Sequence, residues 1–218
     1  MPLKTFYNLP KKRRLEIIDA AYEEFALHEY RNASINNIVS KLNIAKGSFY
    51  RYFTNKKDLY FYLITYAEKM RFEQVDALLS GKEMDFFDLI TENFAMKIKF
   101  DMEFPLYSAF LYNVMQEKNN DDLGNIQLQI KQRILDIVVK MLAPRIEQKE
   151  IRSNLSVFDM AYLVIQVQWG IYDYLEIKYG VNFRENARNK RSVFTIPKEE
   201  ILKDVKSFSM LLRNGMRN

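Results

Sequence analysis

The sequence predicts an all-α protein. Only six glycines and five prolines occur in 218 residues, and proteins built on sheets need more turn-forming residues than that. Between these few breaks, apolar residues recur at the three- and four-residue spacing of helices. Apolar residues make up 48% of the chain and include 16 Phe and 14 Tyr, which is enough material for a large helical core.

The composition argues against several classes of protein. The chain has no cysteine, which excludes disulfides, thiol nucleophiles and Cys-ligated zinc. A single histidine and the lack of a glycine-rich phosphate loop leave little for catalysis or nucleotide binding, so we expect neither an enzyme nor a cofactor. We find no signal-peptide pattern and no apolar run long enough to span a membrane, and we expect a cytoplasmic protein without membrane contact.

The net charge of +5 lies in the first quarter of the chain. Residues 1–60 contain 11 basic and six acidic residues, and the remaining residues contain 22 of each. A basic end on a neutral body favours a polyanion as the partner of that end. A solvated basic face without a partner is the alternative.

Two short helices joined by a tight turn are predicted after a first helix over residues 11–27. Ser34 is expected to cap the second helix, residues 35–42, because its hydroxyl can accept from a free backbone N–H. Asn43 tolerates the left-handed backbone that ends this helix, and a third helix fits residues 45–52. These elements have the pattern of a helix-turn-helix.

The third helix has the side chains that the major groove of DNA requires. Ala45, Gly47 and Ser48 keep its start thin, so that the backbone can approach closely, while Phe49 faces inward. A glycine within a helix costs about 1 kcal/mol relative to alanine, which fits a need for clearance. Lys56 begins the next helix and is expected to add its charge to a phosphate. Further donors and flat faces come from Lys46, Tyr50, Arg51 and Tyr52.

At these residues the chain resembles the TetR family of bacterial regulators. The resemblance covers residues 11–65 and is carried by ASINNIVSKL at 33–42 and NIAKGSFYRYFTNKKDLY at 43–60. Glu29, Asn43 and Ala45 depart from the family pattern. The resemblance implies DNA contacts at Ser34, Lys46, Ser48, Tyr50, Tyr52 and Lys56, with Arg51 at a variable position suited to reading a base. With Asn36 and Gly47, these residues form the predicted DNA-binding set.

We expect residues 1–54 to form the DNA-binding domain and residues 55–218 a helical ligand-binding and dimerisation domain. Breaks are expected at Ser80–Gly81 and in a polar loop around residues 119–124. Residues 181–195 are polar and basic, and we expect a loop there. The helices of this second domain are predicted at residues 55–70, 86–99, 106–115, 126–142 (ending before Pro144), 156–179 (capped by Ser156) and 197–214.

An apolar pocket is predicted between residues 86–115 and 157–175. The aromatic and methionine side chains there exceed what a small bundle needs, and a flexible aromatic pocket suits an extended hydrophobic ligand. Simple core packing is the alternative for any one of these residues. The candidate ligand-binding residues are Phe94, Phe104, Tyr107, Phe110, Met115, Gln168, Trp169 and Tyr172.

Residues 156–179 carry apolar side chains on two adjacent helical faces, a wider surface than one neighbour can cover. We therefore expect this helix to pack on its own core and on a partner chain, the alternative being burial within one chain. The family resemblance likewise implies a homodimer through residues 156–179 and 197–214. Its two recognition helices would read the half-sites of a near-palindrome.

The sequence thus predicts a transcriptional repressor that a small hydrophobic ligand releases from a near-palindromic operator. A ligand that prefers another arrangement of the helix at 55–70 would shift the population off DNA. One alternative is a helical sensor or scaffold whose helix-turn-helix is not used for sequence-specific binding. Another is an activator, or a regulator without a small-molecule effector.

Overall fold

The computed structural model describes residues 1–79, 84–117 and 121–217. Within these ranges the chain forms eleven helices and no strand, which confirms the all-α prediction; one isolated antiparallel bridge pairs Ile151 with Arg217. The helices are α1 (Lys4–Tyr7), α2 (Lys11–Leu27), α3 (Ile35–Lys41), α4 (Lys46–Phe49), α5 (Lys56–Leu79), α6 (Phe86–Glu103), α7 (Pro105–Gln116), α8 (Ile126–Glu147), α9 (Val157–Tyr179), α10 (Phe183–Arg188) and α11 (Lys198–Met216).

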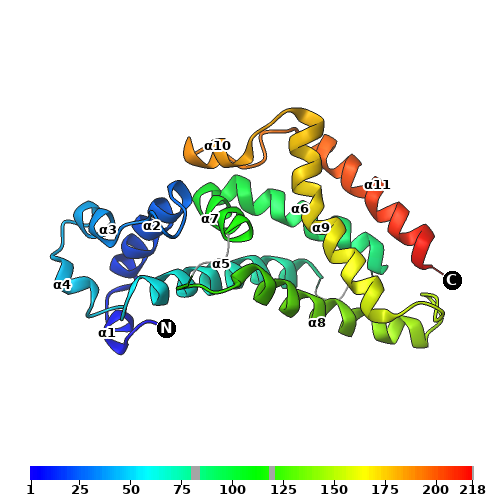
Figure 1. The fold of residues 1–218 in the computed structure, drawn as a ribbon, viewed down its shortest axis with the longest axis horizontal. Coiled ribbons are helices and arrows are strands. Elements are labelled where there is room, and N and C mark those ends of the chain that lie inside the picture. The colour runs from blue at the N-terminus through cyan, green and yellow to red at the C-terminus, as the bar shows by residue number, and fades with distance from the viewer. Residues whose placement is uncertain (80–83, 118–120, 218) are drawn as a thin grey trace.

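The molecule is elongated, with α1 to α4 gathered at one end and the C-terminus at the other (Figure 1). The long helix α5 runs from the N-terminal group into the body, and α8 lies along the same side. An ion pair of 2.6 Å joins Arg133 of α8 to Glu68 of α5. Helix α5 is therefore shared between the two ends, and the predicted domain division between residues 54 and 55 stays a prediction.

Local capping signals place the N-terminal helices where the sequence predicts them. The Ser34 hydroxyl accepts from the backbone N–H of Asn36 at 3.2 Å and so caps α3. Asn43 leaves the next turn with a φ of 51°, in the left-handed region. Asn55 caps α5, because its side-chain oxygen accepts from the backbone N–H of Asp58 at 2.8 Å. Ser34 and Asn55 thus satisfy free N–H groups at the start of a helix, and the left-handed backbone of Asn43 allows the chain to leave one.

The recognition helix α4 is shorter than the predicted helix over residues 45–52. It ends at Phe49, and the next three residues form tight turns. The N–H of Arg51 donates to the carbonyl of Ser48 at 3.2 Å, and that of Tyr52 to Phe49 at 2.8 Å. These bonds span three residues instead of the four of an α-helix, so Tyr50, Arg51 and Tyr52 follow the helix as a turn.

A short helix at the N-terminus, α1, is missing from the sequence-based prediction. The backbone N–H of Leu3 donates to the carbonyl of Tyr52 at 2.8 Å. The ring of Phe6 is fully buried, 5.0 Å from that of Phe53 and 5.5 Å from that of Tyr62. Residues 3–7 thereby pack against the turn after α4 and stabilise it.

Helix α8 continues through Pro144 to Glu147, so the expectation that it ends before the proline was wrong. Proline has no backbone N–H, so the carbonyl of Lys140, four residues earlier and exposed, lacks its helical hydrogen bond. The helix still closes its last turn, because the Pro144 carbonyl accepts from the N–H of Gln148 at 3.0 Å. The lost bond therefore falls at the surface, near the end of the helix, where it is tolerated.

Residues 181–195 do not form the simple polar loop that the sequence suggested. They contain α10, and Val193 and Phe194 are buried. The carboxylate of Asp101 on α6 accepts from their backbone N–H groups at 2.9 Å and 3.1 Å. This buried acid ties the segment to the body. The expected break at Ser80–Gly81 lies outside the described residues, as do residues 119 and 120 of the loop expected at 119–124. Residues 121–123 of that loop form a turn.

Buried side chains form two adjacent apolar clusters. The larger joins α1 to α5 with α7, α10 and parts of α6, α9 and α11, so the N-terminal helices and the body share one core. The smaller lies at the far end, between α6, α8, α9 and α11. In the part of the chain that the structure describes, no helix is long and apolar enough to cross a membrane.

Candidate nucleic-acid interface and ligand cavity

The turn between α3 and α4 is braced from α2. The backbone N–H of Ile44 donates to the carbonyl of Val39 at 3.0 Å, which closes the turn. The guanidinium of Arg13 donates to the carbonyl of Leu42 at 3.2 Å. The carboxylate of Glu24, itself 8% exposed, accepts from the backbone N–H of Ser34 at 2.8 Å. These bonds fix α3 and the start of α4 relative to α2.

Helix α4 and its following turn present cations and an aromatic ring outward. Phe49 is buried and anchors the helix, whereas Tyr50 is 49% exposed and Lys46 and Arg51 are exposed. Among the described residues, the side chains of Lys46 and Arg51 have no hydrogen-bond or ion-pair partner. Two unpaired cations beside an exposed ring are suited to phosphates and base edges.

Gly47 lies on the exposed side of α4. A Cβ atom at this position would meet no other atom within 4 Å. Packing within the protein therefore does not require glycine there. A need for clearance from a partner outside the protein accounts for it better, and this agrees with close approach to DNA.

Lys56 is held within the protein. Its ammonium donates to the backbone carbonyls of Tyr30 at 2.7 Å, Ala33 at 3.0 Å and Arg31 at 3.3 Å. Burial lowers the pKa of this lysine, although Asp122, Glu117 and Glu24 oppose the effect. An ammonium has three N–H donors, and all three are used here.

The other predicted DNA-contact residues lie around α4. Asn36 is exposed on the first turn of α3, and Ser34 and Ser48 are partly exposed. Tyr52 is also partly exposed, with its ring 6.3 Å from that of Phe6. The predicted set thus falls at one end of the molecule, on α3, α4 and the start of α5.

Residues 17–63 match the sequence model of the bacterial regulatory proteins of the tetR family. A crystal structure of a TetR family transcriptional regulator from Chloroflexus aurantiacus J-10-FL superimposes over the whole molecule, with a TM-score of 0.70, 26% identity, and coverage of 100% of this chain and 99% of that one. The chain thus resembles the TetR family in the sequence of its N-terminal helices and in its whole fold. The family match covers α3, α4 and most of α2, together with the start of α5, which are the helices that carry the exposed cations.

Curated relatives match a smaller part of the chain. The probable acrEF/envCD operon repressor of Escherichia coli (strain K12) is 27% identical over 100 residues, 46% of each protein. The fatty acid metabolism regulator protein of Bacillus subtilis (strain 168) is 25% identical over 152 residues, 67% of this chain and 75% of that protein. The chain therefore spans about half the length of the first of these relatives.

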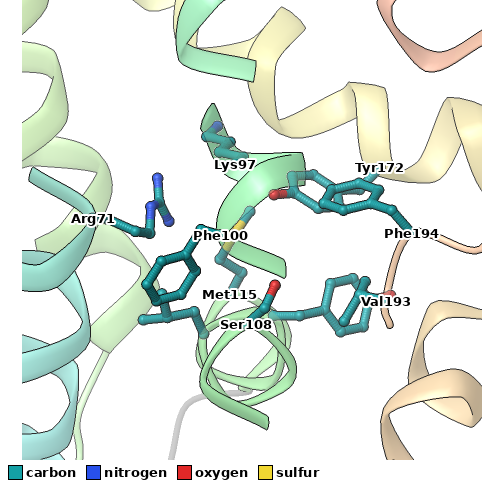
Figure 2. A pocket seen from close by; sticks show the side chains of 10 residues that line it. Arg71, Lys97, Phe100, Ser108, Met115, Tyr172, Val193 and Phe194 are labelled. Carbon is teal, nitrogen blue, oxygen red and sulfur yellow. The ribbon is translucent and has the colours of Figure 1, made fainter. Parts of the chain in front are cut away.

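A small cavity lies in the body, with an empty volume of about 330 Å³ that includes its opening. Most of this volume belongs to the opening, and the enclosed part is far smaller than a typical ligand pocket, so a ligand has to widen it. Figure 2 shows Arg71 and Lys97 on one side of it and Tyr172, Val193 and Phe194 on the other. The full lining is Arg71, Lys97, Phe100, Ser108, Leu111, Tyr112, Met115, Tyr172, Val193 and Phe194.

The cavity brings together two of the eight predicted ligand-binding residues, Met115 and Tyr172. The other six lie outside its lining. Phe94 is buried next to Tyr172, and Phe110 is buried in the shared core. Phe104 stacks on Tyr107, whose hydroxyl donates to Asp19 of α2 at 2.6 Å. Gln168 is partly exposed, and Trp169 packs against the smaller cluster with Lys131 above its ring at 4.6 Å.

Sequence reasoning missed the two cations of the cavity, Arg71 and Lys97. Each reads as an ordinary solvated charge on a helix. Lys97 has one weak signal, because it stands between the buried Met96 and Ile98. Val193 and Phe194 were missed because the segment before α11 was taken for a polar loop.

One face of α7 lines the cavity and another holds α2. Ser108, Leu111 and Met115 face the cavity. The amide of Asn113 donates to the carbonyls of Phe25 and Ala26 at 3.1 Å and 2.8 Å, at the end of α2. Directly after α7, the carboxylate of Glu117 accepts from the backbone N–H of Tyr30 at 3.2 Å. A shift of α7 would therefore act on both the cavity and the DNA-binding helices.

Large apolar side chains are exposed on the two long C-terminal helices. On α9, Ile177 is 84% exposed, and on α11 Leu211 is 65% exposed. The two helices contact each other in the chain and lie together at the end far from α4. Further exposed apolar residues on these helices are Phe158, Tyr162, Leu163 and Met210. These side chains are the exposed apolar residues of the two helices from which the sequence predicts a dimer.

Proposed function

We propose that this chain is a DNA-binding transcriptional repressor. The main support comes from α4 and the turn that follows it. There the cations Lys46 and Arg51 and the ring of Tyr50 are exposed, and both cations lack a partner among the described residues. Clearance at Gly47 adds to it. The similarity to the probable acrEF/envCD operon repressor of Escherichia coli supports repression over activation.

The same proposal includes a homodimer that reads a near-palindrome. The exposed apolar side chains of α9 and α11 support this, because contact with a second copy would remove them from water. Each copy would then present one α4 to one half-site. DNA as the partner also supports a cytoplasmic location and a role other than catalysis.

Release from DNA would come from a ligand in the body cavity. The sequence pointed to the helix at 55–70 as the moving part, and α5 does line the cavity through Arg71. The contacts of α7 support a second route, since Asn113 holds the end of α2 while Met115 lines the cavity. A ligand shifts the equilibrium only if it prefers the arrangement that does not fit the operator.

The alternative, a helical sensor or scaffold that does not use its helix-turn-helix, is not favoured. A scaffold has no use for unpaired cations around a thin helix start. An activator would share the same DNA-binding face, and the sign of regulation is decided by transcription from a promoter that carries the site.

Fluorescence anisotropy with duplexes from the gene's own upstream region tests the proposal. We expect tight binding to one near-palindromic duplex and much weaker binding to a scrambled duplex of equal composition, at low and at physiological salt. Arg152→Ala, which removes a cation at the far end, serves as the matched control for Arg51→Ala. Equal affinity for specific and scrambled duplexes at both salt concentrations would exclude sequence-specific regulation.

A further inference from the structure

Two cations line the cavity, and both lack an ion-pair partner among the described residues. Arg71 comes from α5 and Lys97 from α6, and neither forms an ion pair with a described residue. The ammonium of Lys97 lies 4.7 Å from the ring centre of Phe94 and 6.0 Å from that of Tyr172. Aromatic faces stabilise a cation only partly, so the charge lacks a counter-ion.

The carboxylates in this region are already committed. Asp101, also on α6, accepts from the backbone N–H groups of Val193 and Phe194 and from the hydroxyl of Ser192. Glu176 accepts from the backbone N–H of Phe183 at 2.7 Å. Glu68, the acid that interacts with Arg71, is paired with Arg133 at 2.6 Å. The charged side chains in the lining itself are both cations.

Burial and the neighbouring Arg71 guanidinium lower the pKa of Lys97 to about 7. A lysine in this position is costly to keep charged unless an anion comes close. An oxyanion would supply the missing counter-charge and accept hydrogen bonds from both side chains.

The uncharged side chains of the lining determine which chemical groups can follow the anionic head of the ligand. Phe100, Leu111, Met115 and Phe194 offer apolar surface. The hydroxyls of Ser108 and Tyr172 have no hydrogen-bond partner among the described residues. Burial raises the pKa of Tyr172 to about 12, so its hydroxyl stays a donor at neutral pH. This combination fits a charged head followed by a short apolar chain.

We propose that the cavity binds a small amphiphile with an oxyanion head, held by Arg71 and Lys97, and an apolar tail of short to medium length. The proposal narrows the hydrophobic ligand of the repressor to an anionic class and rests on that proposed function for its regulatory meaning. The small enclosed space favours a short tail over a long one, and the lining has to move apart to admit it. The binding itself is measured without DNA.

Isothermal titration calorimetry on the full chain, with octanoate and octan-1-ol as matched probes, tests the proposal. Octanoate should bind about tenfold or more tightly than octanol, because only octanoate can accept charge-assisted hydrogen bonds from the two cations. Lys97→Gln and Arg71→Gln should each lower octanoate affinity about tenfold and leave octanol affinity unchanged. Lys99→Gln, an exposed change on the same helix, should alter neither.

Lys97→Arg separates loss of charge from loss of fold, since it keeps the cation and should retain most of the octanoate affinity. Circular dichroism on each variant checks its helical content. Failure of octanoate to bind the unaltered chain, equal affinity for the two probes, or a similar loss in Lys99→Gln would each overturn the anionic site. Operator binding by the ligand-free protein is a separate measurement, so its failure would contradict the repressor and leave the calorimetric result standing.

Discussion

The ammonium of Lys56 lies 4.4 Å from the ring centre of Tyr30 and donates to the carbonyl of the same residue at 2.7 Å. The sequence suggested a phosphate as the partner of Lys56. In the structure its charge instead joins the start of α5 to the turn between α2 and α3. Lys56 thereby positions the DNA-binding helices on the helix that enters the body.

Lys56→Met should lower the free energy of unfolding by about 1–3 kcal/mol, because the buried carbonyls of Tyr30 and Ala33 lose a charged donor. Chemical denaturation measures this, and Lys57→Met, at an exposed neighbouring position, is the control. The salt dependence of operator binding distinguishes the two roles. A positioning lysine leaves the slope unchanged, whereas loss of a phosphate contact reduces it by about 1.

Truncation of Lys46 and truncation of Arg51 should change DNA binding in different ways. Lys46→Ala should weaken binding to all duplexes alike and reduce the salt slope by about 1, as expected for one phosphate contact. Arg51→Ala should relax discrimination at one base pair by about 1–3 kcal/mol. Anisotropy titrations against single-base variants of the operator measure both. If Arg51→Ala lowers affinity for every duplex by the same factor, Arg51 does not read a base.

Gly47→Ala should separate stability from binding. The site has room for a Cβ, and alanine favours a helix over glycine by about 1 kcal/mol. We therefore expect equal or higher thermal stability together with weaker operator binding, because the methyl group would stand between α4 and the groove. A variant that binds the operator as tightly as the unaltered chain would show that clearance at this position does not matter.

Short-range signals made the N-terminal helices predictable. Ser34 and Asn55 cap the helices that follow them, and Asn43 turns through the left-handed region, each for a reason contained within a few residues. Helix α2 has the predicted bounds of residues 11 and 27. The exposed side of α4 follows from the same local pattern, because Phe49 fixes which side is buried.

The cavity could not be predicted in the same way. Its lining comes from α5, α6, α7, α9 and the segment before α11, so no short stretch of sequence contains it. Aromatic and methionine content selected Met115 and Tyr172, which line the cavity, and their role in ligand binding stays a prediction. It also selected Phe110, which packs in the core, because burial and pocket lining leave the same pattern in a helix. Phe6 was missed because its partners, Phe53 and Tyr62, are distant in sequence.

Leu211→Glu should disrupt the proposed dimer. Leu211 is 65% exposed on α11, and a carboxylate there would be buried without a partner in an apolar interface. Leu128→Glu on α8, at a side chain 58% exposed, is the matched control. Analytical ultracentrifugation should show monomers for Leu211→Glu and dimers for Leu128→Glu and the unaltered chain. The operator affinity of Leu211→Glu should be reduced as well. Dimers of unchanged stability in Leu211→Glu would place the interface elsewhere.

The depressed pKa of Lys97 should give a specific pH dependence of stability in the ligand-free protein. The folded pKa is about 7, against 10.5 for an unperturbed lysine. Between these values the unfolded chain binds the proton more tightly, so this group makes stability rise with pH from about 7 toward 10.5. Below about 7 the lysine is charged in both states and the full burial penalty remains.

Lys97→Met removes this dependence, so the variant should gain most over the unaltered chain near pH 6, and the gain should shrink as the pH rises through 7 toward 10. The groups that face Lys97 do not reverse this sign. Burial keeps Tyr112 and Tyr172 neutral over this range. The other charged groups nearby are the guanidinium of Arg71 and the carboxylate of Asp101, which accepts from backbone N–H groups. No residue of α11 lines the cavity.

Urea unfolding at several pH values measures the gain in the free energy of unfolding. Octanoate affinity should fall as the pH rises through the same range, because the ammonium of Lys97 loses its proton. A constant gain at all pH values would mean that Lys97 titrates like a solvated lysine, and a solvated lysine has no need of an anion.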